Sequence, residues 1–278
     1  MSVLLFTALI LLGSFLAGFL GSLTGLGGGV VIVPLLALVF HVDMRYAIGA
    51  SLVSVIATSS GAAAAYVREG YSNMRIGMFL EIATTIGAIA GALIAARVST
   101  STIAIVFGFV LLYSAYLSVR AQPPHPVNEP QDRLARFLRL DGDYPTPQGS
   151  EHYTVHRIPL GFGLMFGAGT LSGLLGIGSG AVKVLAMDQA MRIPFKISTT
   201  TSNFMIGVTA AASAGVYLAR GYIDPGIAMP VVLGALAGSM LGAKVLVNAR
   251  TRSLRFVFSA VIVALGFEMI FNGFTGRL

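Results

Sequence analysis

The sequence predicts an all-α integral membrane protein, an inverted repeat of two five-span halves whose second and seventh helices are short and follow glycine-rich breaks. Three observations lead to this fold class. Hydrophobic residues make up 55% of the 278 residues and charged residues only 10%, whereas a soluble domain carries about 25% charged residues. Residues 16–97 recur at 167–248. The glycine-rich breaks lie at matching positions of the two copies.

The internal repeat has a constant offset of 151 residues. When 16–97 is laid over 167–248 without gaps, 20 of 82 positions are identical, mostly at glycine and other small residues. A duplicated membrane half with a broken apolar segment at equivalent positions is typical of secondary transporters, whose substrate site lies between the repeats. The repeat therefore predicts a kind of function as well as a fold.

Ten apolar runs predict the membrane spans, and most have the roughly 20 residues that a helix needs to cross a bilayer. The second and seventh are about half as long. The first run has no basic residue before it, so we expect a retained span and not a cleaved signal peptide. The predicted spans are 3–23, 28–40, 46–67, 76–97, 101–119, 158–175, 180–191, 197–219, 226–247 and 253–274.

Loop charge distinguishes two topologies, because the two short segments either cross the membrane or enter and leave on one side. If both cross, the basic residues divide twelve against four between the two sets of loops. If both are re-entrant, the division is nine against seven. The positive-inside rule favours ten spans with both termini outside. Five spans per half is an odd number, so the two repeats have opposite orientations.

Three segments divide the chain: a first membrane repeat at 1–120, a cytoplasmic loop at 121–157, and a second, inverted repeat at 158–278. In the loop, Arg133, Arg136 and Arg139 follow one another at helical spacing. They predict either a short amphipathic helix on the anionic leaflet or part of an ordinary linker.

The glycine-rich breaks predict the substrate site. Glycine lets the backbone unwind and approach a ligand, and a helix that begins there directs free N–H groups at the break. Lys183 lies just beyond the second break, where it either binds an anion or extends to the membrane surface. Alternatively, the small residues only permit close helix crossing. The two breaks are residues 25–29 and 176–180, and the candidate substrate-binding residues within them are Gly27, Gly28 and Gly29, and Gly178, Ser179 and Gly180.

Polar side chains follow each break on the next span. Thr199, Ser202 and Asn203 lie on one helical face at i, i+3 and i+4 spacing. Thr209 follows seven residues after Ser202, and Ser51 is the repeat equivalent of Ser202. These residues either line the pathway or hold helices together, as serine and threonine often do in membranes. Asn203 is the stronger candidate, because its amide needs several hydrogen-bond partners.

Charged residues within predicted spans each need a reason, since burying them in lipid is unfavourable. Asp188 precedes Arg192 by four residues, which favours an ion pair, and Glu81 could pair with Arg75. Glu268 has no partner in the sequence and is the candidate for proton coupling; alternatively, it is a protonated side chain bonded to a neighbouring helix.

Other functions have weaker support. The sequence 178–180 resembles a serine nucleophile motif, but all four histidines fall in loops or at an interface, so no general base is available and we expect no enzyme. We also expect no metal site, no cofactor and no nucleic-acid partner. The expected partners are a small anion and membrane lipid; the oligomeric state is left open.

These motifs resemble the TauE/SafE (TSUP) family of sulfite and organic-anion exporters. The resemblance rests on the first break running into Val33-Pro34 and on the sequence of residues 201–210. It implies transport of sulfite, sulfonates, thiosulfate or related anions, linked to protons, in a bacterial inner membrane. The chain departs from the family pattern at Ser179, Lys183 and Leu185, which bears on the choice of substrate.

We therefore expect a multi-pass secondary transporter of the bacterial inner membrane. It would export a small sulfur-containing or organic anion by alternating access, linked to protons. An uptake permease or an anion channel of the same architecture is the alternative.

Overall fold

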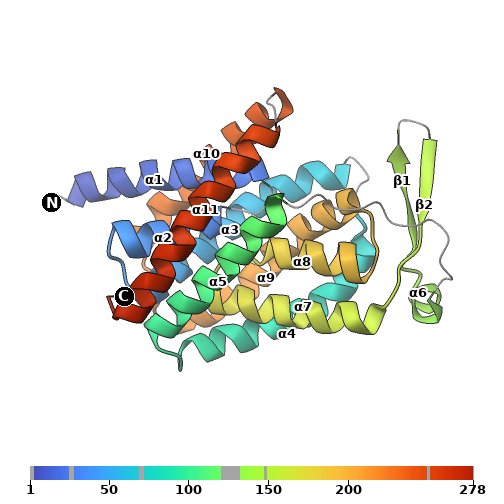
Figure 1. Ribbon diagram of the computed structural model, residues 1–278, viewed down its shortest axis with the longest axis horizontal. Helices are drawn as coiled ribbons and strands as arrows, with labels where there is room; N and C mark the ends of the chain where they lie inside the picture. Colours follow the sequence, from blue (N-terminus) through green and yellow to red (C-terminus); the bar gives the residue numbers. More distant parts are fainter. Residues whose placement is uncertain are drawn as a thin grey trace.

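The computed structural model describes residues 3–24, 28–68, 72–119, 132–146, 149–248 and 251–277. They form a bundle of helices with a β-hairpin at one end (Figure 1). The first half contains α1 (Val3–Thr24), α2 (Gly29–Pro34), the π-helix η1 (Leu35–Val39), α3 (Met44–Arg68), α4 (Met74–Ala95) and α5 (Thr100–Val119). Between the halves lie α6 (Arg133–Leu138), β1 (Gly142–Thr146) and β2 (Gly149–Tyr153). The second half contains α7 (Ile158–Leu175), α8 (Gly180–Leu185), η2 (Ala186–Ala190), α9 (Phe195–Ala219), α10 (Pro225–Asn248) and α11 (Thr251–Thr275).

The outer surface of the bundle is apolar. On α4, Met78, Ile82 and Ile86 are each more than half exposed, while Glu81 and Thr84 on the opposite face are buried. Such a pattern suits lipid outside and protein inside. Within the described residues, α1, α4, α7, α9 and α10 are long and apolar enough to cross a membrane. The chain is therefore a multi-pass, all-α membrane protein.

The helices recur with the offset found in the sequence. Helices α3 and α9 begin 151 residues apart and end 151 residues apart. The short helix α2 with η1 corresponds in the same way to α8 with η2. The short segments expected at 28–40 and 180–191 are thus present, each as an α-helix that continues into a π-helix.

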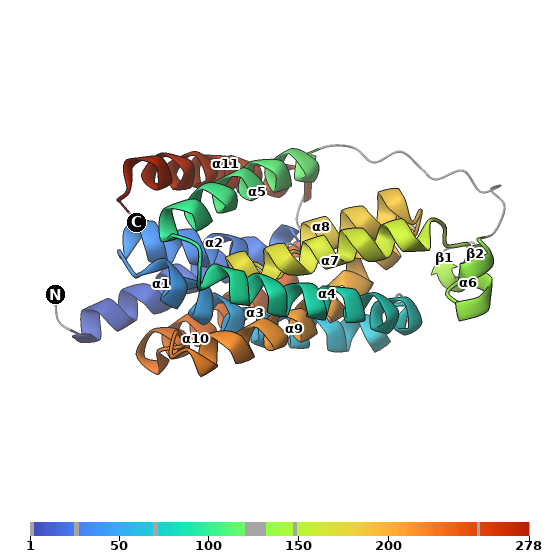
Figure 2. The same ribbon diagram turned by 90° about the horizontal axis from the view of Figure 1, so that it is seen from below.

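Most of the packing joins one half to the other. The most extensive contacts are α1 with α10, α4 with α7, α5 with α11, and α3 with α9. Figure 2 shows α5 and α11 together along one side of the bundle. By the offset of 151, α1 corresponds to α7 and α4 to α10. The first two contacts are therefore each other's equivalents with the halves exchanged.

Glycines bring these paired helices into backbone contact. A Cβ atom on Gly87 of α4 would lie 2.2 Å from the carbonyl oxygen of Phe166 on α7. A Cβ atom on Gly238 of α10, the equivalent of Gly87, would lie 2.0 Å from the carbonyl oxygen of Phe15 on α1. Phe15 and Phe166 are themselves 151 residues apart. Small residues permit such close helix packing in membranes, and here they do so reciprocally.

The two ends of the bundle differ. Both chain termini lie at one end of the long axis, and α6 with the hairpin lies at the other (Figure 1). Helix α1 runs from the terminal end towards the hairpin end, and its equivalent α7 runs in the opposite direction.

Between the halves, the described residues 132–146 and 149–157 form a short helix and an antiparallel hairpin. The amphipathic helix considered for this segment is present as the six-residue α6, with Phe137 exposed and Ala135 buried. The antiparallel hairpin β1–β2 was not predicted. It is held partly by side chains: Tyr144 donates a hydrogen bond to Glu151 (2.9 Å), and His152 lies 2.8 Å from Asp143.

We expect Gly87→Leu and Gly238→Leu each to destabilise the protein by at least about 1–3 kcal/mol, because a larger side chain must separate two backbones in contact. Thermal unfolding of the purified protein in detergent measures the effect. Gly163→Leu on α7 is the matched control, since nothing lies within 4 Å of its added Cβ. Equal melting temperatures for all three variants would contradict this packing.

Candidate functional site

The two glycine-rich breaks lie against each other in the middle of the bundle. A Cβ atom on Gly29 would lie 3.1 Å from the carbonyl oxygen of Gly176. Ser51 of α3 donates a hydrogen bond to that same oxygen (2.8 Å). Gly28 is buried beside them, whereas Gly27 lies outside the described residues. In the described part of the chain, Gly29 of the first break and Gly176 of the second are therefore in contact, and a shared substrate site at the two breaks stays a prediction.

The second break has an unusual backbone. Gly178 has φ +70°, which glycine adopts readily, but Ser179 has φ +47°. This left-handed conformation is unfavourable for residues with a Cβ atom and tends to occur at functional sites. At the equivalent position, Gly28 has φ −66°. The two breaks are thus equivalent in place but not in conformation.

The Ser179 hydroxyl lies in this strained turn without a hydrogen-bond partner among the described residues. Its side chain is only 3% exposed. It borders a cavity of about 10 Å³, close to the smallest space that holds a water molecule. The cavity is lined by Val30, Val110, Ser114, Ile177, Ser179, Gly180 and Val182. A polar atom therefore faces a small enclosed space between the two breaks.

Lys183 is fully buried, one turn into α8. Its Nζ donates a hydrogen bond to Oγ1 of Thr209 on α9 (2.5 Å). The ammonium group thus points into the protein, and the alternative in which Lys183 extends to the membrane surface is wrong. A buried ammonium group is very unfavourable unless it has hydrogen bonds and a compensating charge nearby.

Glu81 of α4 supplies that negative charge. Thr209 Oγ1 accepts the hydrogen bond from Lys183 and donates one to Glu81 Oε1 (2.7 Å). Thr85 also donates to Oε1 (3.2 Å). The other carboxylate oxygen, Oε2, is buried and has no hydrogen-bond partner among the described residues. Three helices, α4, α8 and α9, therefore meet at one charged cluster, which we call the Lys183–Thr209–Glu81 cluster.

The suggested pairing of Glu81 with Arg75 is wrong. Arg75 is exposed and donates to the carbonyl oxygen of Arg139 (3.5 Å). Glu81 lies almost two turns further along α4, on the buried face.

The charged cluster has no charged counterpart in the other half. Lys183 corresponds to Ile32 and Glu81 corresponds to Val232, whereas Thr209 corresponds to Thr58. Ile32 is fully buried. The repeated architecture therefore carries one charged and one apolar version of the same three-helix meeting point.

The candidate polar residues Ser202 and Asn203 of α9 and Ser51 of α3 are buried. Ser202 donates to the carbonyl oxygen of Gly180 (3.3 Å), so it contacts the second break. Asn203 is buried on the same helix. Ser51 contacts the second break from α3, as described above. All three lie in the interior, and their role in substrate binding stays a prediction.

Glu268 lies elsewhere. It is exposed on α11, a helix that packs mainly against α5. The structure does not bring Glu268 together with the breaks, and its proton-coupling role stays a prediction. Asp188 is buried on η2.

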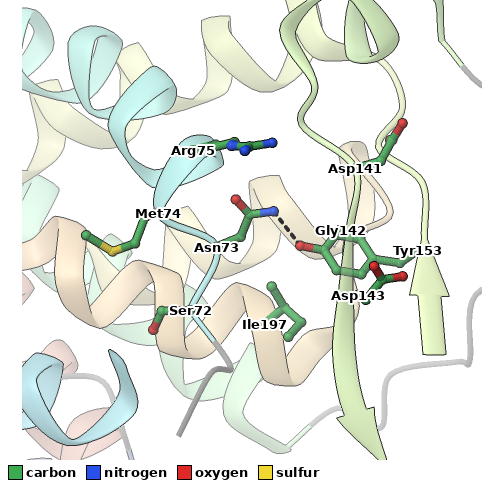
Figure 3. Close-up of a pocket in the computed structure, with 9 residues that line it drawn as sticks. All are labelled: Ser72, Asn73, Met74, Arg75, Asp141, Gly142, Asp143, Tyr153 and Ile197. Atoms are coloured by element: carbon green, nitrogen blue, oxygen red, sulfur yellow. Dashed lines mark hydrogen bonds between the residues drawn. The ribbon is translucent and has the colours of Figure 1, made fainter. Parts of the chain in front are cut away.

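A second cavity, of about 310 Å³, lies at the hairpin end between β1 and the starts of α4 and α9 (Figure 3). Asn73 points towards Tyr153 in this view and donates to its hydroxyl (2.6 Å) and to the carbonyl oxygen of Leu140 (3.1 Å). Its backbone N–H donates to Thr201 Oγ1 (3.1 Å). Burial raises the pKa of Tyr153 to about 12. Asn73 thus connects the hairpin to α4 and α9.

Sequence reasoning placed Thr209 on the polar face of the span at 197–219, but it missed Glu81 as part of the site. The available signals were a carboxylate within a predicted span and the equivalence of Thr209 to Thr58 in the repeat. Neither signal shows which helices meet, since Thr209 and Glu81 are 128 residues apart in the chain.

Comparison with known proteins identifies the family of the chain. The profile of the family described as Sulfite exporter TauE/SafE matches residues 10–269. Among curated proteins, the chain is 29% identical over 277 residues to the probable membrane transporter protein YunE of Bacillus subtilis, covering 96% of this chain and 98% of that protein. It is 23% identical over 282 residues to the probable membrane transporter protein MJ0441 of Methanocaldococcus jannaschii, covering 96% of each. No solved structure matches significantly. The match over nearly the whole membrane portion shows that the chain belongs to the sulfite exporter TauE/SafE family.

Proposed function

We propose that the chain is a secondary transporter that moves a small anion across a bacterial inner membrane by alternating access. The observation that carries this proposal is the fully buried ammonium group of Lys183, one turn beyond the place where the two breaks meet. An ionisable group this deep in a membrane protein usually belongs to a substrate or ion pathway.

The charge of Lys183 favours an anionic substrate. Each hydrogen bond between a charged donor and such a ligand contributes roughly 1.5–3 kcal/mol. The interaction is also stronger in a site from which water is excluded than in bulk water. Ser179 adds a hydroxyl that has no hydrogen-bond partner among the described residues. An ammonium group and a free hydroxyl suit a compact oxyanion such as sulfite, a sulfonate or a carboxylate.

The enclosed geometry favours a transporter over a channel. The space beside Ser179 is only about 10 Å³, which would hold a water molecule and not a substrate. A substrate therefore needs a change of conformation to enter, as alternating access provides.

The two halves make equivalent contacts with their roles reversed, which provides a physical basis for that change. Gly18 lies against the carbonyl oxygen of Ala235, and Gly169, its equivalent, lies against that of Thr84, the equivalent of Ala235. Together with the opposite directions of α1 and α7 (Figure 1), this supports an inverted five-plus-five repeat. In such an arrangement, exchanging the conformations of the two halves converts an inward-open state into an outward-open state.

Export of sulfite or an organosulfonate, linked to protons, is the specific form we propose. The family description names a sulfite exporter, and Ser179 and Lys183 are the residues of this chain at which another anion could be selected.

Lys183→Met should weaken anion transport, with an apparent affinity roughly 10- to 150-fold lower, because about one charge-assisted interaction is lost. The measurement is flux into proteoliposomes of sulfite, thiosulfate, methanesulfonate and acetate, with and without a pH gradient. Lys196→Met is the matched control, since Lys196 is exposed at the start of α9. Wild-type flux in Lys183→Met, or transport of cations alone by the wild-type protein, would contradict the anion proposal.

The distribution of basic residues between the loops predicts that the hairpin is cytoplasmic and that the C-terminus is outside. The chain has no cysteine, so Ser150→Cys on β2 and Thr275→Cys on α11 each introduce a single label site. In intact cells, an impermeant maleimide should label Thr275→Cys at once and Ser150→Cys only after the membrane is permeabilised. Labelling of Ser150→Cys alone from outside would reverse the orientation.

A further inference from the structure

We propose that Glu81 is the proton-coupling group of the transport site, so that one monovalent anion crosses the membrane together with one proton. This inference rests on the proposed function and deepens it. It replaces Glu268, the candidate from the sequence, with a carboxylate that the structure places beside the buried ammonium group of Lys183.

The first step of the argument is the net charge of the cluster. Thr209 Oγ1 contacts both Lys183 Nζ and Glu81 Oε1. With Glu81 ionised, the ammonium and carboxylate charges cancel, and adding an anion leaves one uncompensated negative charge in the protein interior. With Glu81 protonated, the cluster carries one positive charge, and adding a monovalent anion makes it neutral. Because uncompensated buried charge is strongly unfavourable, anion binding and proton uptake favour each other.

The second step is the geometry of the carboxylate. Oε1 receives hydrogen bonds, whereas the buried Oε2 has no partner among the described residues. An oxygen in this position can take up a proton without breaking an existing hydrogen bond. Thr209 Oγ1 also lies 2.9 Å from the carbonyl oxygen of Met205. Its single hydroxyl proton can therefore turn from the carboxylate to the backbone when the carboxylate becomes neutral.

The third step concerns the other charges nearby. Helix α4 packs against α7, which has no ionisable side chain, and against α9. Arg75 is directed to Arg139, Lys196 is exposed, and Tyr217 donates to Gly173. The ionisable side chains on the elements around Glu81 are Arg75 on α4, Lys183 on α8, Asp188 on η2, and Lys196 and Tyr217 on α9. Of these, Lys183 is the residue that shares a hydroxyl with Glu81.

The resulting cycle balances. A proton from water on one side adds to Oε2 of Glu81, and the ammonium group of Lys183 binds the anion. After the conformational change, the anion leaves to the other side and Oε2 returns its proton to water there. The positive charge of Lys183 and the negative charge of Glu81 then cancel again. One negative charge and one proton have crossed, so the transport of a monovalent anion is electroneutral. Export then follows the anion's own gradient, for a product that accumulates in the cell.

The test uses the full-length protein in proteoliposomes with radiolabelled methanesulfonate, which stays monovalent throughout the pH range used. In the wild-type protein, a gradient of about one pH unit should concentrate the anion about tenfold on the alkaline side of the membrane, because one proton moves with each anion. A potassium–valinomycin potential should leave the rate unchanged. Glu81→Gln keeps the shape and a hydrogen-bond acceptor for Thr209, but it cannot exchange a proton. It should retain exchange of labelled for unlabelled methanesulfonate, lose accumulation driven by the pH gradient, and become sensitive to the potential.

Each outcome decides a different claim. If the wild-type protein moves no anion of the panel used for Lys183→Met, the proposed function fails and this inference fails with it. If the wild-type protein is coupled to protons and Glu81→Gln remains coupled, the inference is overturned and the proposed function stands. Loss of coupling in Glu268→Gln, with coupling intact in Glu81→Gln, would return the role to Glu268.

The wild-type protein also provides a test that does not depend on folding of a variant. Methanesulfonate transport by the wild-type protein should generate no current on a solid-supported membrane, whereas a current of one negative charge per anion would overturn the inference. Thr209→Val offers a second variant, because it removes the hydroxyl that contacts both Lys183 and Glu81 and leaves both ionisable groups in place. It should reduce accumulation driven by the pH gradient more than it reduces exchange.

Discussion

The contact of Lys183 with Glu81 through Thr209 is the constraint on which the rest of the structure depends. An ammonium group fully enclosed by apolar helices is stable only where hydrogen bonds and a compensating charge are fixed in place. Thr209 fixes both distances, since its one oxygen contacts both groups. The cluster therefore ties α8, which follows the second break, to α4 and α9. In the mechanism that we propose, a rearrangement at the break alters this contact and so couples the charge balance of the site to its conformation.

The packing of the two halves holds this cluster at the centre of the bundle. Reciprocal glycine contacts bring α1 against α10 and α4 against α7, so neither half forms a core without the other. The two meeting points of three helices are equivalent in position, but only one is charged. In the transport mechanism that we propose, this scaffold changes conformation by exchanging equivalent contacts, and the anion binds to Lys183 in both states. The equivalent residue Ile32 is apolar, so its burial needs no compensating charge.

Much of the fold could be predicted because its signals are local or periodic. The apolar runs, the offset of 151 and the glycine breaks are all present in the sequence, and the short helices at the breaks follow from them. Lys183 could be selected by its distance from the break, but whether it pointed inwards could not be decided, since both orientations suit one helical turn. Glu81 could not be paired with it, because the contact joins helices far apart in the chain and depends on which faces the glycines bring together. The hairpin could not be predicted because β1 contains Pro145, and proline within a run of residues argues against a strand.

A double-mutant cycle tests most directly whether Glu81 and Lys183 form one compensated unit. The free energies of unfolding would be measured in detergent for the wild-type protein, Glu81→Gln, Lys183→Met and the double variant. If the charges compensate each other, the double variant should be more stable than the sum of the two single effects predicts, by a coupling energy of about 0.5–3 kcal/mol. Additive effects, with a coupling energy near zero, would contradict the account.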